Sequence, residues 1–378
     1  MDLNLSDELQ AFRQTARDFA HRTIAPLVDE AEAAERTPLE LFKAAGAAGF
    51  LGIRYPESVG GQGAGVLAET ILREEMARVC SGLAAAISVS SHLGTYPIHE
   101  FGDDEQQQRY LVPALKGEVV SAFGLTEPGA GSDVRSITTR AVRDGDDWVI
   151  TGRKTYITNA TIADFMIVVA YTDPTAGLDG MAMFVVDLPD SKIEVTRLGK
   201  MGHLSSEIGE VAFDGVRVPA RACLGGERGA WAKVMKTLGI GRVVVSGGAI
   251  GTAQEAIDLA VDYAKERPAF GKPIGTNQGI SFPLARAEAH TEAARLAVYK
   301  AAWLYDQASE PVKEVSVAKY LAAEAAIGAT DVAIRVFGGA GYVRGSKVER
   351  LYRDARYFPI VEGTSEIHQR VIASRLGL

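Results

Sequence analysis

The sequence predicts a multidomain α+β protein in which an N-terminal helical domain is followed by a β-barrel domain and then by a C-terminal helical bundle. Three observations predict this order. Helical spacing of apolar residues marks both ends of the chain, and short β-branched runs between turns fill its middle. The 378 residues, 47% of them hydrophobic, are enough for two or three packed units. We expect domains over residues 1–118, 119–225 and 226–378.

The first domain carries the signals of successive helices. Ser6 is a favourable N-cap residue, and Asp7 and Glu8 place negative charge in the first turn of a helix. Segments rich in Ala, Leu and Glu then recur to about residue 117, interrupted only at "RYPESVGGQGAG" and "FGDDE". This region is therefore expected to be entirely helical.

The second and third domains differ in periodicity. Strands are predicted at "DWVITGRKTYITNA", "FMIVVAYTD", "MAMFVVDL", "IEVTRLGK" and "GEVAFDGVRVP", where Gly, Asp and Pro separate the runs. After "ERGAW" helical spacing returns, and we expect long helices almost to Leu378. This order differs from the strand–helix alternation of a doubly wound fold, so a bound dinucleotide would not occupy a Rossmann site.

Composition excludes several classes of function. The net charge is −8 and the basic residues are dispersed, which argues against a nucleic-acid surface. The only cysteines, Cys80 and Cys223, indicate a reducing, cytoplasmic location. The six histidines lack the spacing of a helical metal site, so we expect no metal. A signal peptide and an apolar run of about 18 residues are both missing, so we expect no membrane span.

Two stretches of the second domain have the character of a ligand site. In "AFGLTEPGAGSD", Gly129 and Gly131 allow close backbone approach and Ser132 with nearby N–H groups could face a phosphate, although an ordinary turn has the same composition. In "KTYITNA", Tyr156 and Thr158 stand two apart on one strand, and therefore on one face. That pair suits a flat heteroaromatic ring, but it also suits an ordinary half-buried strand.

Three stretches of the third domain are further candidates. "ERPAFGKPIGTNQ" offers Arg267 and Gln278 for phosphate and adenine, or Arg267 as a simple helix cap. "RVFGGAGYVRG" could admit a cofactor against bare backbone or be an interhelical turn. In "RYFPIVEGTSEIHQR", Glu362 follows an apolar run and precedes Gly363. It could be a solvated residue before a helix.

These stretches, in this order and together with "DGVRVP" and "EGTSEI", resemble the acyl-CoA dehydrogenase family over nearly the whole chain. The resemblance implies FAD as cofactor, shared across subunits of a homotetramer, and an electron-transfer flavoprotein as electron acceptor. It also implies cofactor contacts from Phe123, Leu125, Thr126, Gly131, Ser132, Tyr156, Ile157, Thr158, Arg267, Phe270, Gln278, Arg335, Val336, Gly338, Gly339, Thr364 and Glu366.

The resemblance further implies α,β-dehydrogenation of an acyl-CoA thioester, with Glu362 as the base that removes the α-proton while a hydride passes to flavin N5. Ser132, Arg242 and Gly363 match substrate-contacting positions. We expect Phe358, Pro359, Ile360 and Val361 to surround Glu362 with apolar groups, which would raise its pKa and make it a stronger base. Some relatives carry the base before the Arg of "GIGRVVVSG", where this chain has Gly241.

Several positions depart from the family pattern. Val361 replaces a common Tyr, which we interpret as a cavity reshaped for branched or bulkier acyl groups, and Arg335 and Leu204 replace a frequent Gln and Arg. "LGIGR" lacks a frequent Asp, so the thioester carrier could be an acyl-carrier protein instead of CoA. An oxygen-using oxidase and a non-catalytic FAD- or acyl-binding assembly protein are further alternatives. The length argues against the oxidase, and the retained Glu362 against the assembly protein.

Overall fold

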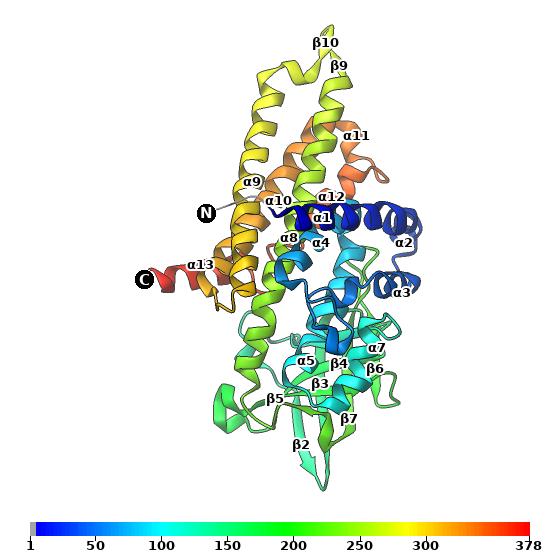
Figure 1. Cartoon of the computed structure of the whole chain (residues 1–378), viewed down its shortest axis with the longest axis vertical. Coiled ribbons are helices and arrows are strands. Elements are labelled where there is room, and N and C mark those ends of the chain that lie inside the picture. Colours follow the sequence, from blue (N-terminus) through cyan, green and yellow to red (C-terminus); the bar gives the residue numbers. More distant parts are fainter. Residues whose placement is uncertain (1–4) are drawn as a thin grey trace.

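The computed structural model describes residues 5–378, in which two helical regions flank a single large sheet (Figure 1). The sheet forms the lower part of the view, and the long helices of the C-terminal region rise above it. The expected order of helices, sheet and helices is confirmed.

The N-terminal region is helical, as predicted, and breaks fall at the two predicted stretches, but residues 35–39 between α2 and α3 form a further break that was not predicted. Ser6 caps the first helix by accepting a hydrogen bond from the Leu9 N–H at 3.3 Å. The longest helix of the region, α4, kinks at Cys80, where φ is −153° and ψ is 107°. The α-helices are α1 (Asp7–Phe19), α2 (Val28–Ala34), α3 (Glu40–Ala47), α4 (Gly65–Ser88), α5 (Tyr96–Phe101), α6 (Asp104–Gln106) and α7 (Val112–Leu115).

Eight strands form one sheet in the order β6-β7-β3-β2-β4-β5-β8, with β1 pairing along β4. The β1–β4 and β2–β4 pairs are parallel and the others antiparallel. All of β4 is buried, which explains its unbroken apolar sequence. The strands are β1 (Ser121–Gly124), β2 (Arg140–Asp144), β3 (Asp147–Thr158), β4 (Phe165–Tyr171), β5 (Met181–Asp187), β6 (Ile193–Arg197), β7 (Ile208–Pro219) and β8 (Cys223–Leu224).

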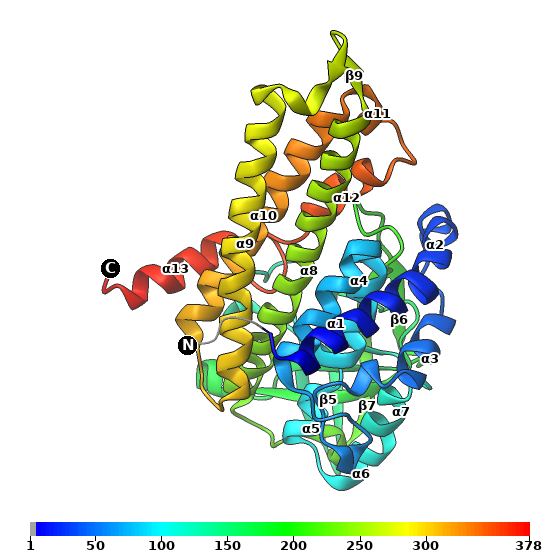
Figure 2. The same ribbon diagram turned by 45° about the horizontal axis from the view of Figure 1, so that its top comes forward.

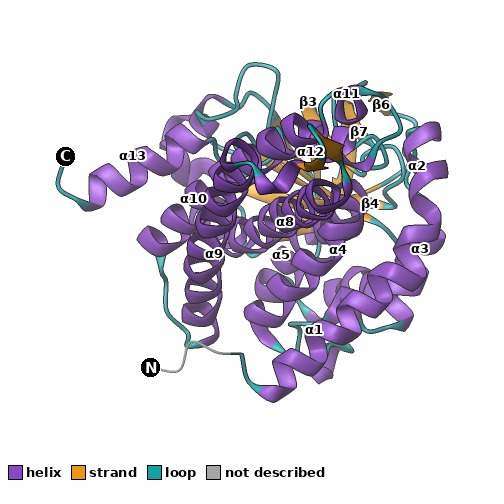
Figure 3. Ribbon diagram, turned by 90° about the horizontal axis from the view of Figure 1, so that it is seen from above, coloured by secondary structure: helices purple, strands orange, loops and turns teal. Residues whose placement is uncertain are grey.

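The C-terminal region is a helical bundle built on α8, α9 and α10, which Figure 3 shows from above. It also contains a small antiparallel hairpin, β9–β10, that the sequence reading missed. The hairpin forms at "PAFGKP", where Phe270 has a φ of +53°. The elements are α8 (Ala230–Glu266), β9 (Pro268–Ala269), β10 (Lys272–Pro273), α9 (Gln278–Asp306), α10 (Val312–Phe337), α11 (Gly339–Tyr342), α12 (Lys347–Ala355) and α13 (Ser365–Arg375).

Glycines on α8 let α4 pack closely against it. A Cβ atom at Gly247 would lie 2.5 Å from the Thr70 carbonyl oxygen, and one at Gly251 would lie 2.1 Å from the Glu74 carbonyl oxygen. Any larger residue at these two positions would push the helices apart. The "SGGAIG" segment therefore joins the N-terminal helices to the C-terminal bundle.

The helix α13 extends away from the rest of the molecule (Figure 2). Within residues 5–378, no helix combines the length and the apolar character that crossing a bilayer requires.

Candidate functional site

The loop between α12 and α13 presents Glu362 in an unusual backbone conformation. Glu362 has a φ of +54°, and Gly363 follows with a φ of +99°. The left-handed region costs a non-glycine residue roughly 1–2 kcal/mol, so other contacts must hold the loop. Arg242 Nε donates to the Glu362 carbonyl oxygen at 2.8 Å. Thr364 caps α13 by accepting from the Ile367 N–H at 3.3 Å.

A buried lysine on α10 donates hydrogen bonds to the same loop. Lys319 is 1% exposed, and its Nζ donates to the Phe358 carbonyl oxygen and, at 3.4 Å, to that of Gly363. Burial lowers the pKa of Lys319 to about 8, and the neighbouring Glu362 charge opposes that shift. No motif in the sequence marks Lys319 as part of this site.

The Glu362 carboxylate rests on the bare backbone of α8. A Cβ atom at Gly241 would lie 2.5 Å from Glu362 Oε2, so position 241 must be glycine for the carboxylate to occupy this place. Oε2 is buried and has no hydrogen-bond partner within the described chain. Burial raises the pKa of Glu362 to about 7, although the positive charges of Arg242 and Lys319 oppose it. A carboxylate of this kind can accept a proton near neutral pH.

The predicted apolar wall around Glu362 is only partly correct. Phe358 is fully buried, and Val361 packs against the main core of the bundle. Ile360, however, is 64% exposed and so does not enclose the carboxylate. The close approach of Glu362 to the α8 backbone at Gly241 contributes to desolvation instead.

The Gly-rich loop after β1 is fixed at its base by a buried ion pair that the sequence reading overlooked. Lys154 Nζ contacts Glu127 Oε1 at 2.8 Å, and both side chains are almost fully buried. Glu127 also accepts hydrogen bonds from the backbone and hydroxyl groups of Thr138 and Thr139. Burial alone would raise the pKa of Glu127, but Lys154 and these hydrogen bonds hold it at about 2. Glu127 lies inside the quoted motif, so the motif itself contained the signal.

The predicted residues of the sheet region lie around this anchored loop. Phe123 and Leu125 are buried, and the Thr126 carbonyl oxygen accepts from the Thr155 N–H at 2.9 Å, which joins the loop to β3. Gly131 and Ser132 are exposed, and a Cβ atom at Gly131 would meet no atom within 4 Å.

The strand residues at "TYIT" alternate in burial, but they do not form a regular strand. Tyr156 is 68% exposed, Ile157 is buried and Thr158 is half-buried. The β3–β7 register shifts between Lys154 and Ile157, and Tyr156 has a φ of +59°. A bulge therefore sets the direction of Tyr156, where we had expected simple alternation.

A second group of predicted residues lies at the opposite end of the molecule, near the β9–β10 hairpin at the top of Figure 1. Arg267 ends α8 with an exposed side chain, Phe270 is 101% exposed, and Gln278 is the exposed first residue of α9. Stacking of Tyr263 on Phe337, with ring centroids 4.2 Å apart, brings the end of α10 to the same place. Its predicted residues are exposed Arg335, buried Val336, and exposed Gly338 and Gly339.

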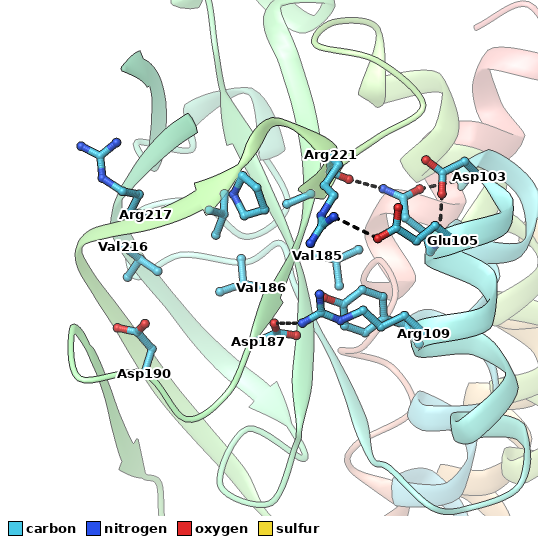
Figure 4. Close-up of a pocket in the computed structure, with 15 residues that line it drawn as sticks. Asp103, Glu105, Arg109, Val185, Val186, Asp187, Asp190, Val216, Arg217 and Arg221 are labelled. Atoms are coloured by element: carbon cyan, nitrogen blue, oxygen red, sulfur yellow. Dashed lines mark hydrogen bonds and ion pairs between the residues drawn. The ribbon is translucent and has the colours of Figure 1, made fainter. Parts of the chain in front are cut away.

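Two pockets lie away from Glu362. One of about 650 Å³ runs between α8 and α9, beside the hairpin, and is lined by residues such as Gln254, Lys265 and Glu288. The other, of about 210 Å³, lies between the N-terminal helices and the sheet (Figure 4). Ion pairs of Arg109 with Asp187 and of Arg221 with Glu105 border it, and it contains none of the predicted site residues.

Comparison with known proteins assigns the chain and its fold to one family. Three segments match its domains: residues 6–118 match the acyl-CoA dehydrogenase N-terminal domain, 122–216 the middle domain and 228–377 the C-terminal domain. The chain belongs to the acyl-CoA dehydrogenase family. The resemblance inferred from the sequence motifs is thus confirmed, and with it an FAD-dependent oxidoreductase class.

Relatives of the acyl-CoA dehydrogenase family match the chain from end to end. A 3-(aryl)acrylate reductase of Clostridium sporogenes is 43% identical, covering 98% of this chain and 99% of the relative. A caffeyl-CoA reductase–Etf complex subunit of Acetobacterium woodii is 40% identical, covering 98% of each. The solved structure of butyryl-CoA dehydrogenase from Megasphaera elsdenii is 36% identical, covers 100% of both chains and superposes with a TM-score of 0.96.

In this acyl-CoA dehydrogenase chain, the loop after β1 and the turn after α10 both have surfaces that fit the family's FAD. A Cβ atom at Gly129, Gly131, Gly338 or Gly339 would meet nothing within 4 Å, so bare backbone is open at both places. Tyr156 and Phe270 present exposed aromatic rings. Exposed backbone and aromatic surface suit a flat, phosphate-bearing cofactor.

Proposed function

We propose that this chain catalyses FAD-dependent α,β-dehydrogenation of an acyl thioester, converting an acyl-CoA to a trans-2-enoyl-CoA, with Glu362 as the base. One observation carries the proposal. A carboxylate with a pKa of about 7 and an unpartnered, buried oxygen is held on Gly241 by a fixed turn. Such a group is suited to remove an α-proton, which a fully solvated carboxylate with its ordinary pKa would do poorly.

Residues of this chain have separate parts in the proposed reaction. Bound FAD would accept the β-hydrogen as hydride. Glu362 would hold the α-proton on its carboxylate, while Arg242 fixes the Glu362 carbonyl oxygen and hence the direction of the side chain. Gly363 has a φ of +99°, a conformation that side-chain-bearing residues rarely adopt, and it would offer the thioester a backbone without a side chain. A preorganised N–H donor near a developing enolate oxygen typically contributes roughly 3–4 kcal/mol.

The cofactor is proposed to lie between copies of the chain in a homotetramer. Phe123, Leu125, Thr126, Gly131, Ser132, Tyr156, Ile157, Thr158, Thr364 and Glu366 would contact FAD from one copy. Arg267, Phe270, Gln278, Arg335, Val336, Gly338 and Gly339 would contact it from another. The separation of the two groups at opposite ends of one chain supports this arrangement (Figure 1).

The electron partner is proposed to be an electron-transfer flavoprotein in the cytoplasm. The Acetobacterium woodii relative is named as a subunit of such a complex, which supports this choice. The two widely separated cysteines support a reducing compartment.

The names of two relatives favour a second direction of reaction, from enoyl to saturated acyl. The 43% and 40% identical relatives are both named reductases. Glu362 would then return a proton to the α-carbon. Reoxidation of chemically reduced enzyme by an enoyl thioester, followed by flavin absorbance, measures this direction against the first.

Anaerobic bleaching of the bound flavin tests the proposed function without its natural electron acceptor. Purified protein should bind FAD and lose flavin absorbance when mixed with a matching acyl-CoA or carrier-protein thioester. Glu362→Gln should keep the flavin and bleach at least about 100-fold more slowly, the lower range for loss of a general base. Glu324→Gln, exposed on α10, is the matched control and should bleach normally. Normal bleaching by Glu362→Gln would refute the assignment of the base.

A further inference from the structure

Arg73, on α4, is a buried cation without a counter-ion. Its residue surface is 1% exposed, and among residues 5–378 it forms no ion pair. Its two terminal nitrogens donate to the Ser81 carbonyl oxygen at 3.4 Å each, and Nε has no hydrogen-bond partner in this range. Burial lowers the pKa of Arg73 to about 10, which leaves it charged at neutral pH.

Two other buried cations each have a carboxylate, and buried Lys319 has two backbone carbonyl acceptors. Arg54 meets Glu69 at 3.0 Å, and Lys154 meets Glu127 at 2.8 Å. A buried charge is stable only when it is paired and hydrogen-bonded. Arg73 differs from these cations because its Nε donor has no acceptor within residues 5–378, so an anion or a strong acceptor from outside the chain would satisfy it.

Arg73 and Glu362 both lie against glycines of α8. A Cβ atom at Gly248 of α8 would lie 2.9 Å from Arg73 Nε, as one at Gly241 would lie 2.5 Å from Glu362 Oε2. These glycines are seven residues apart, so they share one face of α8 and are separated by roughly 10 Å.

Apolar side chains occupy the face of α8 between these two glycines. Val244 and Val245 come one turn after Gly241 and are 2% and 5% exposed. The face thus presents a carboxylate at Glu362, an apolar stretch, and a guanidinium at Arg73. A ligand that lies along this face would need complementary groups in the same order. These are an acidic C–H at Glu362, an apolar middle, and an oxygen acceptor at Arg73.

We propose that Arg73 binds an oxygen acceptor, preferably a carboxylate, at the distal end of the acyl group. This inference rests on the proposed function and names its substrate class: thioesters whose acyl chain has an apolar middle and a terminal oxygen. A carboxyalkyl group and a hydroxyaryl group both satisfy this chemistry. Guanidinium pairs with carboxylate through two parallel hydrogen bonds, which favours the carboxyalkyl group.

Matched pairs of thioesters test the proposal. Adipoyl-CoA is compared with hexanoyl-CoA, and 3-(4-hydroxyphenyl)propionyl-CoA with 3-phenylpropionyl-CoA, by the rate of flavin bleaching. In the unaltered protein, the oxygen-bearing member of at least one pair should have the higher kcat/KM by about 30-fold or more, the range for a buried charge pair. The pair with the larger ratio identifies the source of the oxygen.

Substitution of Arg73 should remove this preference selectively. Arg73→Met should lose the oxygen-bearing substrate and keep the apolar one, whereas Arg73→Lys should keep part of the preference. Arg78→Met is the matched control, because Arg78 lies on the same helix but pairs with Glu255 and Asp258. It should leave the substrate ranking unchanged. The melting temperature shows whether Arg73→Met folds. If it does not fold, the kcat/KM ratios of Arg73→Lys within the two thioester pairs decide the test.

Three outcomes would overturn the inference. Equal rates within both pairs in the unaltered protein would do so while leaving the proposed function intact. An equal loss for all thioesters in Arg73→Met, with a changed pH profile, would mean that Arg73 only adjusts Glu362. If no thioester bleaches the flavin, the proposed function fails separately. Calorimetric binding of adipoyl-CoA, unchanged by Arg73→Met, would then refute the arginine site by itself.

Discussion

At the scale of single residues, the ionisation of Glu362 predicts how activity depends on pH. Burial raises its pKa to about 7, so the carboxylate is protonated and inactive as a base below that value. The rate of flavin reduction at low substrate concentration should therefore rise with pH through an apparent pKa of about 7. Stopped-flow measurements across two units on either side test this. A rate that is flat or falls over this interval would contradict the role given to Glu362.

Activity should require glycine at position 241, because the Glu362 carboxylate occupies the space that a side chain would need. A methyl group there would lie 2.5 Å from Glu362 Oε2 and would displace the carboxylate. Gly241→Ala should lower kcat by about 100-fold, the cost of misplacing a reacting group by about 1 Å.

A second glycine of a long helix is the control for Gly241→Ala. A Cβ atom at Gly328 of α10 would meet no atom within 4 Å, so Gly328→Ala should leave kcat unchanged and stabilise the helix by up to about 1 kcal/mol. Equal kcat values in the two variants would contradict the spatial argument.

At the scale of elements, the loop before α13 depends on Lys319. Lys319→Met would leave the Phe358 and Gly363 carbonyl oxygens without their donor, at a cost of about 1–3 kcal/mol for buried polar groups. The free energy of unfolding in urea should fall by this amount, and kcat should fall as the loop loses its fixed turn. If the free energy of unfolding falls but kcat does not change, the fixed turn of this loop is not required for the reaction.

The loop after β1 depends on the Glu127–Lys154 pair. Glu127→Gln would leave the Lys154 charge uncompensated and should lower the free energy of unfolding at neutral pH by about 3 kcal/mol or more. The folded-state pKa of Glu127, about 2, is below its unfolded value, so its stabilising effect is present above about pH 4.5 and is lost as pH falls towards 2.

A pH series of unfolding measurements tests the Glu127 prediction. The difference between Glu127→Gln and the unaltered protein should shrink in acid. Glu210→Gln removes the partner of Arg153 from an ion pair whose side chains are both partly exposed, and it serves as the control, with an effect under about 1 kcal/mol at any pH. A difference that stays constant down to the acid limit would mean that the charge of Glu127 is not what stabilises the loop.

At the scale of the whole molecule, α9 presents an apolar stripe that supports assembly. Phe282, Leu296 and Trp303 are 57%, 51% and 51% exposed, and their spacings are multiples of seven, which places them along one side of the helix. Together with the separation of the proposed cofactor residues, this stripe supports the proposed assembly of several copies.

Charges on this stripe should therefore disrupt the assembly. Leu296→Glu combined with Trp303→Glu should reduce the molar mass measured by light scattering and weaken retention of FAD. Leu39→Glu, at a residue 52% exposed in the N-terminal region, should change neither. An unchanged mass in the double variant would rule out α9 as the contact surface.

The sequence by itself determined the order of the three regions and the family. Apolar periodicity depends on neighbouring residues, and the motifs from "GLTEPGAGS" to "VEGTSEI" are local, so both can be read from the chain alone. The roles assigned to the motif residues stay predictions.

Only the tertiary structure decided which groups meet. It placed Glu362 on Gly241, Lys154 against Glu127, and Arg73 on Gly248 without a carboxylate, and it left Ile360 exposed. Each of these contacts joins residues that lie far apart in the sequence. Burial, pairing and pKa arise from such long-range contacts, and no local pattern of residues encodes them.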